Sequence, residues 1–268
     1  MKVKQYHKPW RLLAKKFLYL RPPSIPSKDD VKIIESYLKK ISNPDILIFG
    51  CTYNYRKLLA KYKLFATMVD ITREMYKINT EAIKNIKRKE KFIEANWLTV
   101  RLKKKYDLIL GDFVTSNVPL SKRNKFLENV KRHLKDNGLF ITRIYNTPKK
   151  LISEKEFLKY YKNKKITLQN LNDLWWDSVF QLDFNKKSRT IKCRRGILNF
   201  KRLLKKHPYL KKWLEPYEKY MLTEKKDWTA LPEDKQEKQL KKYFKIIAKK
   251  SAKDYRHWED CVTYILKK

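Results

Sequence analysis

The sequence predicts an α/β fold in which helices cover both faces of a doubly wound parallel sheet. Short apolar runs typical of buried strands alternate with segments of helical spacing, an order that gives parallel strands joined by right-handed crossovers. The clearest unit runs from Asp45 to Asp70: a strand, Gly50, a helical segment and a second strand. Asp70 follows Gly50 by 20 positions, the usual distance for a carboxylate that binds a ribose hydroxyl pair in a nucleotide-binding βαβ unit.

Length and composition favour one large domain, or one domain with an insertion. The chain has 268 residues, of which 42% are hydrophobic and 13% aromatic, so it can bury a full core although 35% of its residues are charged. It has no run of 18 apolar residues and no apolar signal core near its start. Three scattered cysteines predict neither a disulfide framework nor a zinc site, and the four histidines have no metal-ligand spacing. We therefore expect a cytoplasmic protein without a metal and without a membrane partner.

The net formal charge of +38 and the pI of about 10.0 allow two interpretations. A field of this size attracts polyanions such as RNA. Lysine, however, far outnumbers arginine and is spread along the whole chain, which a compositional bias across a genome would also produce. The charge therefore indicates either an RNA or other polyanionic partner, or no partner at all. The oligomeric state cannot be read from it.

Residues 1–27 predict an amphipathic N-terminal helix, because aromatic and apolar residues such as Tyr6 and Trp10 recur at helical spacing. This helix should stop before Pro22 and pack over a concave surface, which we expect to be the cleft at the edge of the sheet. Ser27 should then cap a second helix, which has acidic residues in its first turn.

The remaining elements follow in the order expected for the sheet. Strands are predicted at 46–49, 65–69, 92–94, 106–110, 139–145, 243–248 and 260–266. A helix is predicted from about 71 to 88, and another over 126–134, after which Gly138 should take the left-handed conformation just past the helix end. Residues 147–240 are lysine-rich, helical in pattern and contain several tryptophans, so we interpret them as a helical insertion or cap.

Five short motifs occur in a characteristic order: ILIFGCT at 46–52, VDIT at 69–72 with Met75, ANWL at 95–98, LGD at 110–112 and LKDNGL at 134–139. This order resembles the class I S-adenosylmethionine (SAM) dependent methyltransferases. The resemblance covers roughly residues 28–146 and 241–268. It implies a Rossmann-like seven-stranded sheet, mostly parallel with an antiparallel C-terminal strand. The first motif has one glycine where the family usually has three, and it is closer to a branch of the family whose motif reads L-G-V-T-P-E-L.

The resemblance implies SAM as the cofactor and a set of residues that contact it: Phe49, Gly50, Cys51, Thr52, Asp70, Ile71, Met75, Asn96, Trp97 and Asp112. Gly50 would let the backbone approach the methionine part of SAM, or would be a plain turn glycine. Asp70 would accept hydrogen bonds from the ribose, or would cap the next helix.

The other predicted contacts also have structural alternatives. Asn96, which replaces the usual Asp, would bind adenine or belong to an ordinary turn. Trp97 would stack on the adenine ring or belong to the core. Ile71 and Met75 would border the ring or belong to the core.

Asp112 is the candidate catalytic residue, because active sites in open α/β sheets lie beyond the carboxyl ends of the strands. It would act as a base, orient the substrate, or hold the ammonium group of the cofactor. The candidate substrate-binding residues are Tyr6, Trp10, Trp175 and Trp176, each of which could instead be a core side chain.

Taken together, the residues and the resemblance predict an enzyme that transfers a methyl group from SAM to an O or N nucleophile. The acceptor is a small molecule or, given the charge, an RNA. The alternative is a catalytically inactive relative that binds nucleic acid, which the missing glycines and the +38 charge would fit. A nicotinamide-dependent enzyme is disfavoured because the G-x-G-x-x-G spacing is missing.

Overall fold

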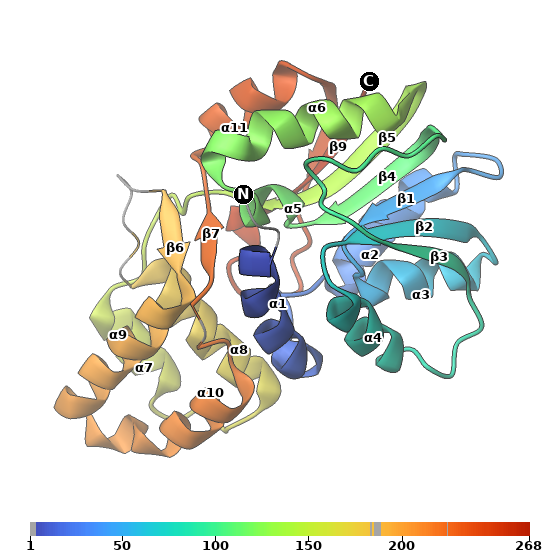
Figure 1. The fold of residues 1–268 in the computed structure, drawn as a ribbon. Helices are drawn as coiled ribbons and strands as arrows, with labels where there is room; N and C mark the ends of the chain where they lie inside the picture. The colour runs from blue at the N-terminus through green and yellow to red at the C-terminus, as the bar shows by residue number, and fades with distance from the viewer. Residues whose placement is uncertain (1–3, 183, 185–188, 224) are drawn as a thin grey trace.

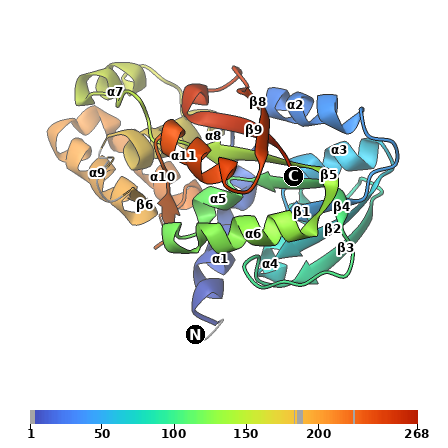
Figure 2. The same cartoon turned by 90° about the horizontal axis from the view of Figure 1, so that it is seen from above.

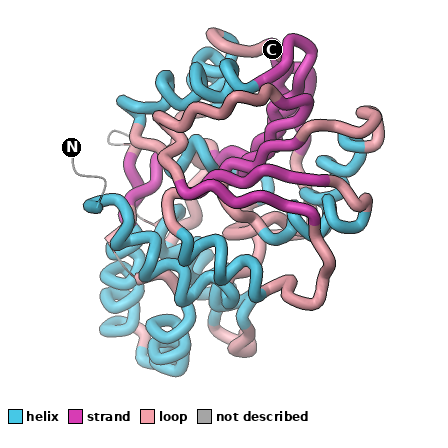
Figure 3. Tube along the Cα trace, turned by 45° about the vertical axis from the view of Figure 1, so that its right-hand side comes forward, coloured by secondary structure: helices cyan, strands magenta, loops and turns pink. Residues whose placement is uncertain are grey.

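A twisted sheet of seven strands forms the centre of the chain (Figures 1 and 3). The computed structural model describes residues 4–182, 184, 189–223 and 225–268, and the side chains of residues 4–9, Tyr6 included, lie outside what is described. The strands of the sheet are β1 (Ile46–Phe49), β2 (Phe65–Asp70), β3 (Lys89–Glu94), β4 (Tyr106–Asp112), β5 (Leu134–Tyr145), β8 (Lys245–Lys250) and β9 (Cys261–Lys267).

The strand order is β3-β2-β1-β4-β5-β9-β8. Strands β1 to β5 pair in parallel, and β9 lies antiparallel between β5 and β8. The predicted seven-stranded sheet, mostly parallel with an antiparallel C-terminal strand, is confirmed. Because β1 and β4 are adjacent while the chain between them runs through β2 and β3, the strand order reverses at β1, and a ligand site is expected beyond the carboxyl ends of these strands.

Helices cover both faces of this sheet (Figure 2). On one face α2 (Lys28–Leu38) and α3 (Tyr53–Lys61) bury apolar side chains such as Ile34 and Leu59 against β1 and β4. On the other face α6 (Arg123–His133) and α11 (Glu233–Lys241) bury Leu127 and Leu240 in a separate apolar cluster. The other helices near the sheet are α1 (Lys4–Lys16), η1 (Phe17–Tyr19), α4 (Arg73–Glu81), α5 (Val114–Asn117), η2 (Leu120–Lys122) and η5 (Trp258–Asp260). No helix among the described residues is long and apolar enough to cross a membrane.

The segment between β5 and α11 forms a helical layer at one end of the sheet (Figure 3). Its elements are α7 (Glu154–Tyr161), α8 (Leu168–Trp176), the π-helical turn η3 (Asp177–Gln181), β6 (Thr190–Lys192), α9 (Cys193–Lys206), η4 (Pro208–Trp213), α10 (Leu214–Tyr220) and β7 (Asp227–Thr229). Its tryptophans and part of α1 share one apolar cluster. Since α11 packs with the sheet, we propose that the insertion predicted at 147–240 ends before Glu233.

Two local expectations differ from the structure. The helix expected to reach residue 88 is shorter, since α4 ends at Glu81. Gly138 does not adopt positive φ, because α6 ends at His133 and Gly138 already belongs to β5. A Cβ atom at this position would lie 2.9 Å from the backbone oxygen of Tyr106 and 2.9 Å from Cδ2 of Leu134. Close packing, and not a left-handed turn, therefore requires glycine there.

A buried arginine joins α2 to the sheet. Arg143, on β5, is 1% exposed, and its Nε donates to Oδ1 of Asp112 at 2.8 Å while its Nη1 donates to Oδ2 of Asp30 at 2.9 Å. The guanidinium group also lies 4.2 Å from the ring centroid of Phe113. Asp30 closes a capping box with Ser27 at the start of α2. Arg143 thus fixes the beginning of α2 beside the ends of β4 and β5.

We predict that Arg143→Met lowers the free energy of unfolding by about 3–5 kcal/mol, because it leaves two buried carboxylates without their cation. Denaturant unfolding followed by circular dichroism measures this change. The matched control is Lys84→Met, which breaks an exposed pair with Glu81 (2.8 Å) and should cost less than about 1 kcal/mol. Equal losses in the two variants would contradict the assigned role of Arg143.

Candidate functional site

A pocket lies beyond the carboxyl ends of β1, β2 and β4, where α1 and the insertion meet the sheet. From the sheet side it is lined by Phe49, Gly50, Cys51, Thr52, Asp70, Met75, Asn79, Trp97 and Asp112. From the opposite side it is lined by Trp10, Leu13, Phe17, Leu20, Ser24, Phe113, Asn117, Trp175, Trp176, Leu222 and Trp228. The structure thus brings together most of the predicted cofactor residues and the described candidates for a substrate wall.

Gly50 forms a tight turn directly after β1. Its φ of +93° lies in the region that favours glycine, and its N–H donates to the backbone oxygen of Val69 at 2.8 Å. The indole Nε1 of Trp97 donates to the same oxygen at 2.8 Å. A Cβ atom on Gly50 would lie 3.8 Å from Cζ2 of Trp97, so the turn passes close under this ring. Gly50 is therefore needed for the turn, and it also lines the pocket.

Asp70 presents a buried carboxylate to the pocket. It is 5% exposed, and its Oδ1 accepts from the backbone N–H of Thr72 at 3.3 Å. Burial raises its pKa to about 7, although hydrogen bonds from the backbone of Thr72 and Ile71 and from the thiol of Cys51 oppose the shift. Among the described residues no ion pair to Asp70 is found. The cap of α4 is Thr72, whose Oγ1 accepts from the N–H of Met75, so Asp70 remains able to accept hydrogen bonds from a ligand.

Two predicted cofactor residues are not among the described residues that line the pocket. Asn96 forms the turn after β3: its Oδ1 accepts from the N–H of Leu98 at 2.9 Å, and its backbone oxygen accepts from Val100 at 2.9 Å. This geometry matches the alternative of an ordinary turn. Ile71 is half-buried just beyond Asp70. Trp97, next to Asn96, is the residue of this segment that reaches the pocket.

Asp112 lines the pocket but is already paired. Arg143 donates to both of its carboxylate oxygens, through Nε at 2.8 Å and Nη2 at 3.2 Å. Burial raises the pKa of Asp112 to about 6, and the charge of Arg143 opposes this shift. Both oxygens of Asp112 are engaged by the guanidinium group, which leaves fewer of their lone pairs directed at a substrate. The geometry therefore disfavours the predicted role of Asp112 as a general base.

Aromatic side chains form the wall opposite the sheet. Trp176 stacks on Phe180 with ring centroids 4.2 Å apart, and Trp175 donates from Nε1 to the backbone oxygen of Leu222 at 2.7 Å. Both side chains are buried and also line the pocket, so each belongs to the core and to the pocket wall.

Lys226 was not predicted as a site residue. Its Nζ lies 4.3 Å from the ring centroid of Trp10, and burial lowers its pKa to about 8.

Three polar atoms at this pocket are buried without a hydrogen-bond partner among the described residues. They are Oγ of Ser24, Oδ1 of Asn117 and Nε1 of Trp176. Buried polar atoms in native proteins are nearly always paired. Neither Ser24 nor Asn117 was predicted as a site residue, although the position of Asn117 shortly after β4 could have indicated a role. A ligand carrying both a donor and an acceptor would satisfy these atoms.

The free space in the pocket is about 60 Å³, whereas ligand pockets usually measure roughly 300–1,000 Å³. Side chains of α1 and the following turn, among them Leu13 and Phe17, take up part of the room. Lys16 holds α1 against the insertion, since its Nζ donates to the backbone oxygens of Glu218 (2.9 Å) and Met221 (2.8 Å). A ligand of nucleoside size therefore needs α1 to move outward.

The strands on the sheet side of this pocket lie in a segment that matches a known family. The sequence model of a family described as "Methyltransferase domain" matches residues 47–142, which run from β1 into β5. This part of the chain is therefore similar to methyltransferase domains. No curated protein matches the sequence of the chain.

Solved structures share the overall fold of the chain. The 1,6-didemethyltoxoflavin-N1-methyltransferase of Burkholderia thailandensis superposes with a TM-score of 0.57 at 7% identity, covering 100% of this chain and 91% of that one. An S-adenosylmethionine-dependent methyltransferase of Clostridium acetobutylicum superposes with a TM-score of 0.52 at 16% identity, covering 89% of each chain.

A structure from Rhodobacter sphaeroides named for Zn-dependent alcohol dehydrogenases also superposes, with a TM-score of 0.61 at 12% identity, covering 97% of this chain and 96% of that one. At this identity the likeness concerns the fold alone. The described residues contain no group of three or more His, Cys, Asp or Glu side chains placed to hold a metal ion.

We predict that Asp70→Asn makes the protein more stable at neutral pH. The folded pKa of about 7 lies above the ordinary value of 3.8, so the stability that protonated Asp70 provides is present at low pH and lost as pH rises from about 4 to 7. The amide does not ionise. The variant should therefore exceed the wild type by about 2–4 kcal/mol near pH 8 and by almost nothing near pH 4. Urea unfolding at both pH values measures the difference, and a pH-independent difference would contradict the assignment.

Proposed function

We propose that the chain is a SAM-dependent methyltransferase that methylates an O or N nucleophile of a small, largely apolar molecule. The observation that carries the proposal is the meeting of Gly50, Asp70 and Trp97 in one pocket with an aromatic wall. The methyltransferase-domain match over the same strands supports SAM as the cofactor.

The residues on the sheet side fit SAM chemically. Asp70 has a buried carboxylate that can accept from both ribose hydroxyls, each charge-assisted bond contributing roughly 1.5–3 kcal/mol. Gly50 presents backbone without a side chain to the amino-acid part, while Trp97 and Met75 offer apolar contact to the base. When bound, SAM supplies a sulfonium methyl group that is already electrophilic.

The chain then has to position the acceptor and exclude water. The wall formed by Phe113, Trp175 and Trp176 keeps the pocket apolar, and α1 covers it. The indole N–H of Trp176 can donate to the acceptor and Oδ1 of Asn117 can accept from its N–H or O–H group, which would fix its orientation. Since Arg143 occupies Asp112, we propose that catalysis rests on positioning more than on a strong base.

The residues that line the pocket favour a small molecule over RNA as the methyl acceptor. Neither lysine nor arginine is found among the described residues that line the pocket. An RNA substrate needs cations that contact its phosphates close to the reacting base. A planar or aliphatic molecule under α1 would instead be enclosed by the aromatic side chains.

We predict that wild-type protein binds S-adenosylhomocysteine and that Asp70→Ala weakens this binding roughly 100-fold, the value of two charge-assisted hydrogen bonds at the low end of their range. Isothermal titration calorimetry measures both affinities. The matched control is Glu81→Ala, because Glu81 is an exposed carboxylate of α4 that does not line the pocket. Its affinity should equal that of the wild type.

The pH dependence of S-adenosylhomocysteine affinity provides a second test. Only ionised Asp70 accepts from both hydroxyls, so affinity should fall toward tenfold per pH unit below about 7, and Asp70→Asn should lose this dependence. No binding by the wild type, together with tight and salt-sensitive RNA binding, would instead support the inactive nucleic-acid-binding alternative.

We further predict that Lys16→Met raises the association rate constant of S-adenosylhomocysteine several-fold. The substitution removes the hydrogen bonds that hold α1 against the insertion, and α1 must move before a nucleoside fits. Stopped-flow tryptophan fluorescence measures the rate. Arg11→Met, which breaks an exposed ion pair of the same helix with Glu74, serves as the control. An unchanged rate in Lys16→Met would show that α1 does not limit binding.

A further inference from the structure

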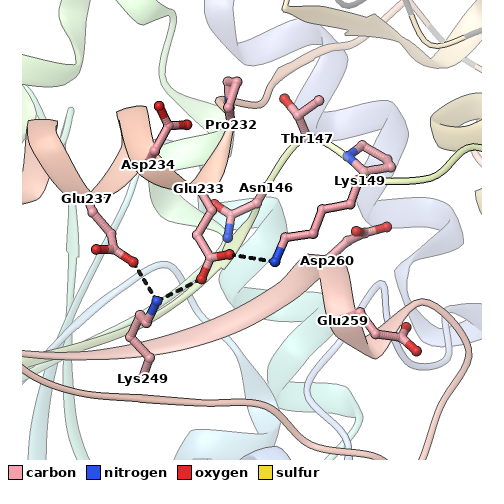
Figure 4. A pocket seen from close by; sticks show the side chains of 11 residues that line it. Asn146, Thr147, Lys149, Pro232, Glu233, Asp234, Glu237, Lys249, Glu259 and Asp260 are labelled. Carbon is pink, nitrogen blue, oxygen red and sulfur yellow. Dashed lines mark hydrogen bonds and ion pairs between the residues drawn. The ribbon is translucent and has the colours of Figure 1, made fainter.

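A second hollow, which we call the acidic hollow, lies just beyond the end of β5. It is bounded by α11, β8 and the turn η5 that precedes β9 (Figure 4). Its volume is about 570 Å³. Five acidic residues line it: Glu233, Asp234, Glu237, Glu259 and Asp260. In a chain of net charge +38 this is a local reversal of sign. No part of the proposed methyl-transfer chemistry uses these residues.

Ammonium groups of the chain itself already occupy one side of this acidic hollow. Nζ of Lys249 lies 2.9 Å from Oε1 of Glu233 and 2.6 Å from Oε1 of Glu237, and Nζ of Lys149 lies 3.2 Å from Oε2 of Glu233 (Figure 4). Glu233 and Glu237 are therefore neutralised by chain lysines. These pairs show that Glu233 and Glu237 bind primary ammonium groups of the chain itself.

Asp234 on α11, and Glu259 and Asp260 of η5 on the opposite side, keep their negative charge (Figure 4). Asp234 and Glu259 are exposed, and the described residues provide neither with an ion pair. Asp260 accepts from Nε2 of Gln181 at 3.1 Å and is half-buried, and burial raises its pKa to about 6. Glu233 and Asp234 also belong to the first turn of α11, where acids stabilise a helix. That effect does not account for Glu259 or Asp260, which come from η5.

Two side-chain oxygens that line the acidic hollow, those of Asn146 and Thr147, are buried without a hydrogen-bond partner among the described residues. Asn146 follows β5 and is 3% exposed; its Nδ2 donates to the hydroxyl of Tyr264 at 3.4 Å, whereas its Oδ1 has no partner among the described residues. Oγ1 of Thr147, the next residue, is likewise buried without a partner in the described part of the chain. Both residues line the acidic hollow. Unpaired acceptors beside unpaired carboxylates call for a ligand that brings several N–H donors.

We propose that the acidic hollow binds a linear aliphatic polyamine through Asp234, Glu259 and Asp260 and through the oxygens of Asn146 and Thr147. A single metal ion fits less well, because the described residues offer no group of metal-ligating side chains in suitable geometry. The basic surface elsewhere does not prevent binding, since charges farther than about 8 Å are largely screened at physiological salt. The proposal does not depend on the methyl-transfer activity.

Calorimetric titration of the full chain with spermidine in about 0.15 M salt tests the proposal. The wild type should bind, and the double variant Asp234→Asn/Glu259→Gln should bind at least about tenfold more weakly, because it loses two carboxylates. Both residues are exposed, so the variant should fold. The matched control is Asp136→Asn/Glu81→Gln, which makes the same change of charge at exposed positions elsewhere.

The polyamine site is supported if only the first double variant weakens binding and if S-adenosylhomocysteine affinity stays the same in both. It is overturned if the wild type shows no binding at about 1 mM spermidine. It is also overturned if the two double variants weaken binding equally, which would mean a non-specific charge effect. Full competition by Mg²⁺ at equal concentration would overturn it as well, because a divalent cation would then be the preferred ligand.

Discussion

The ion pairs of Arg143 are the interaction on which the arrangement of the pocket at the carboxyl ends of the strands depends. A buried guanidinium group needs full compensation, and it obtains this from Asp30 at the start of α2 and from Asp112 at the end of β4. The first contact fixes the helix that leads into β1 and its glycine turn. The second occupies the carboxylate that would otherwise be the nearest base. The same residue therefore sets the position of the site and limits its chemistry.

The parts of the fold that local sequence determines could be predicted. The unit from β1 to Asp70 could be predicted because two apolar runs, a glycine turn and an acidic residue lie within one short stretch of sequence. In the structure Gly50 and Asp70 line the same pocket. Contacts between distant residues could not be predicted. Arg143 and Asp30 are 113 positions apart, and neither carries a signal for the other. For the same reason the sequence could suggest a base at Asp112 but could not show that it is paired.

Asn96 and Gly138 illustrate a different limit. Each residue type fits a familiar motif, and in each case the structure uses it for local geometry: Asn96 closes a turn, and Gly138 allows two strands to approach. The distribution of charge was also beyond prediction. The described lining of the first pocket contains no basic residue, and in the second hollow five acidic residues outnumber Lys149 and Lys249, so the excess positive charge does not gather at either. This arrangement fits compositional bias better than a polyanionic methyl acceptor.

The position of β9 between β5 and β8 has a consequence for synthesis on the ribosome. Strand β8 leaves the exit tunnel before β9, yet its hydrogen-bonding partner in the sheet is β9. Until β9 emerges, both β5 and β8 present unpaired edges, which are prone to pair with other chains. The nascent chain should therefore depend on chaperones most strongly during the interval in which these last strands are translated.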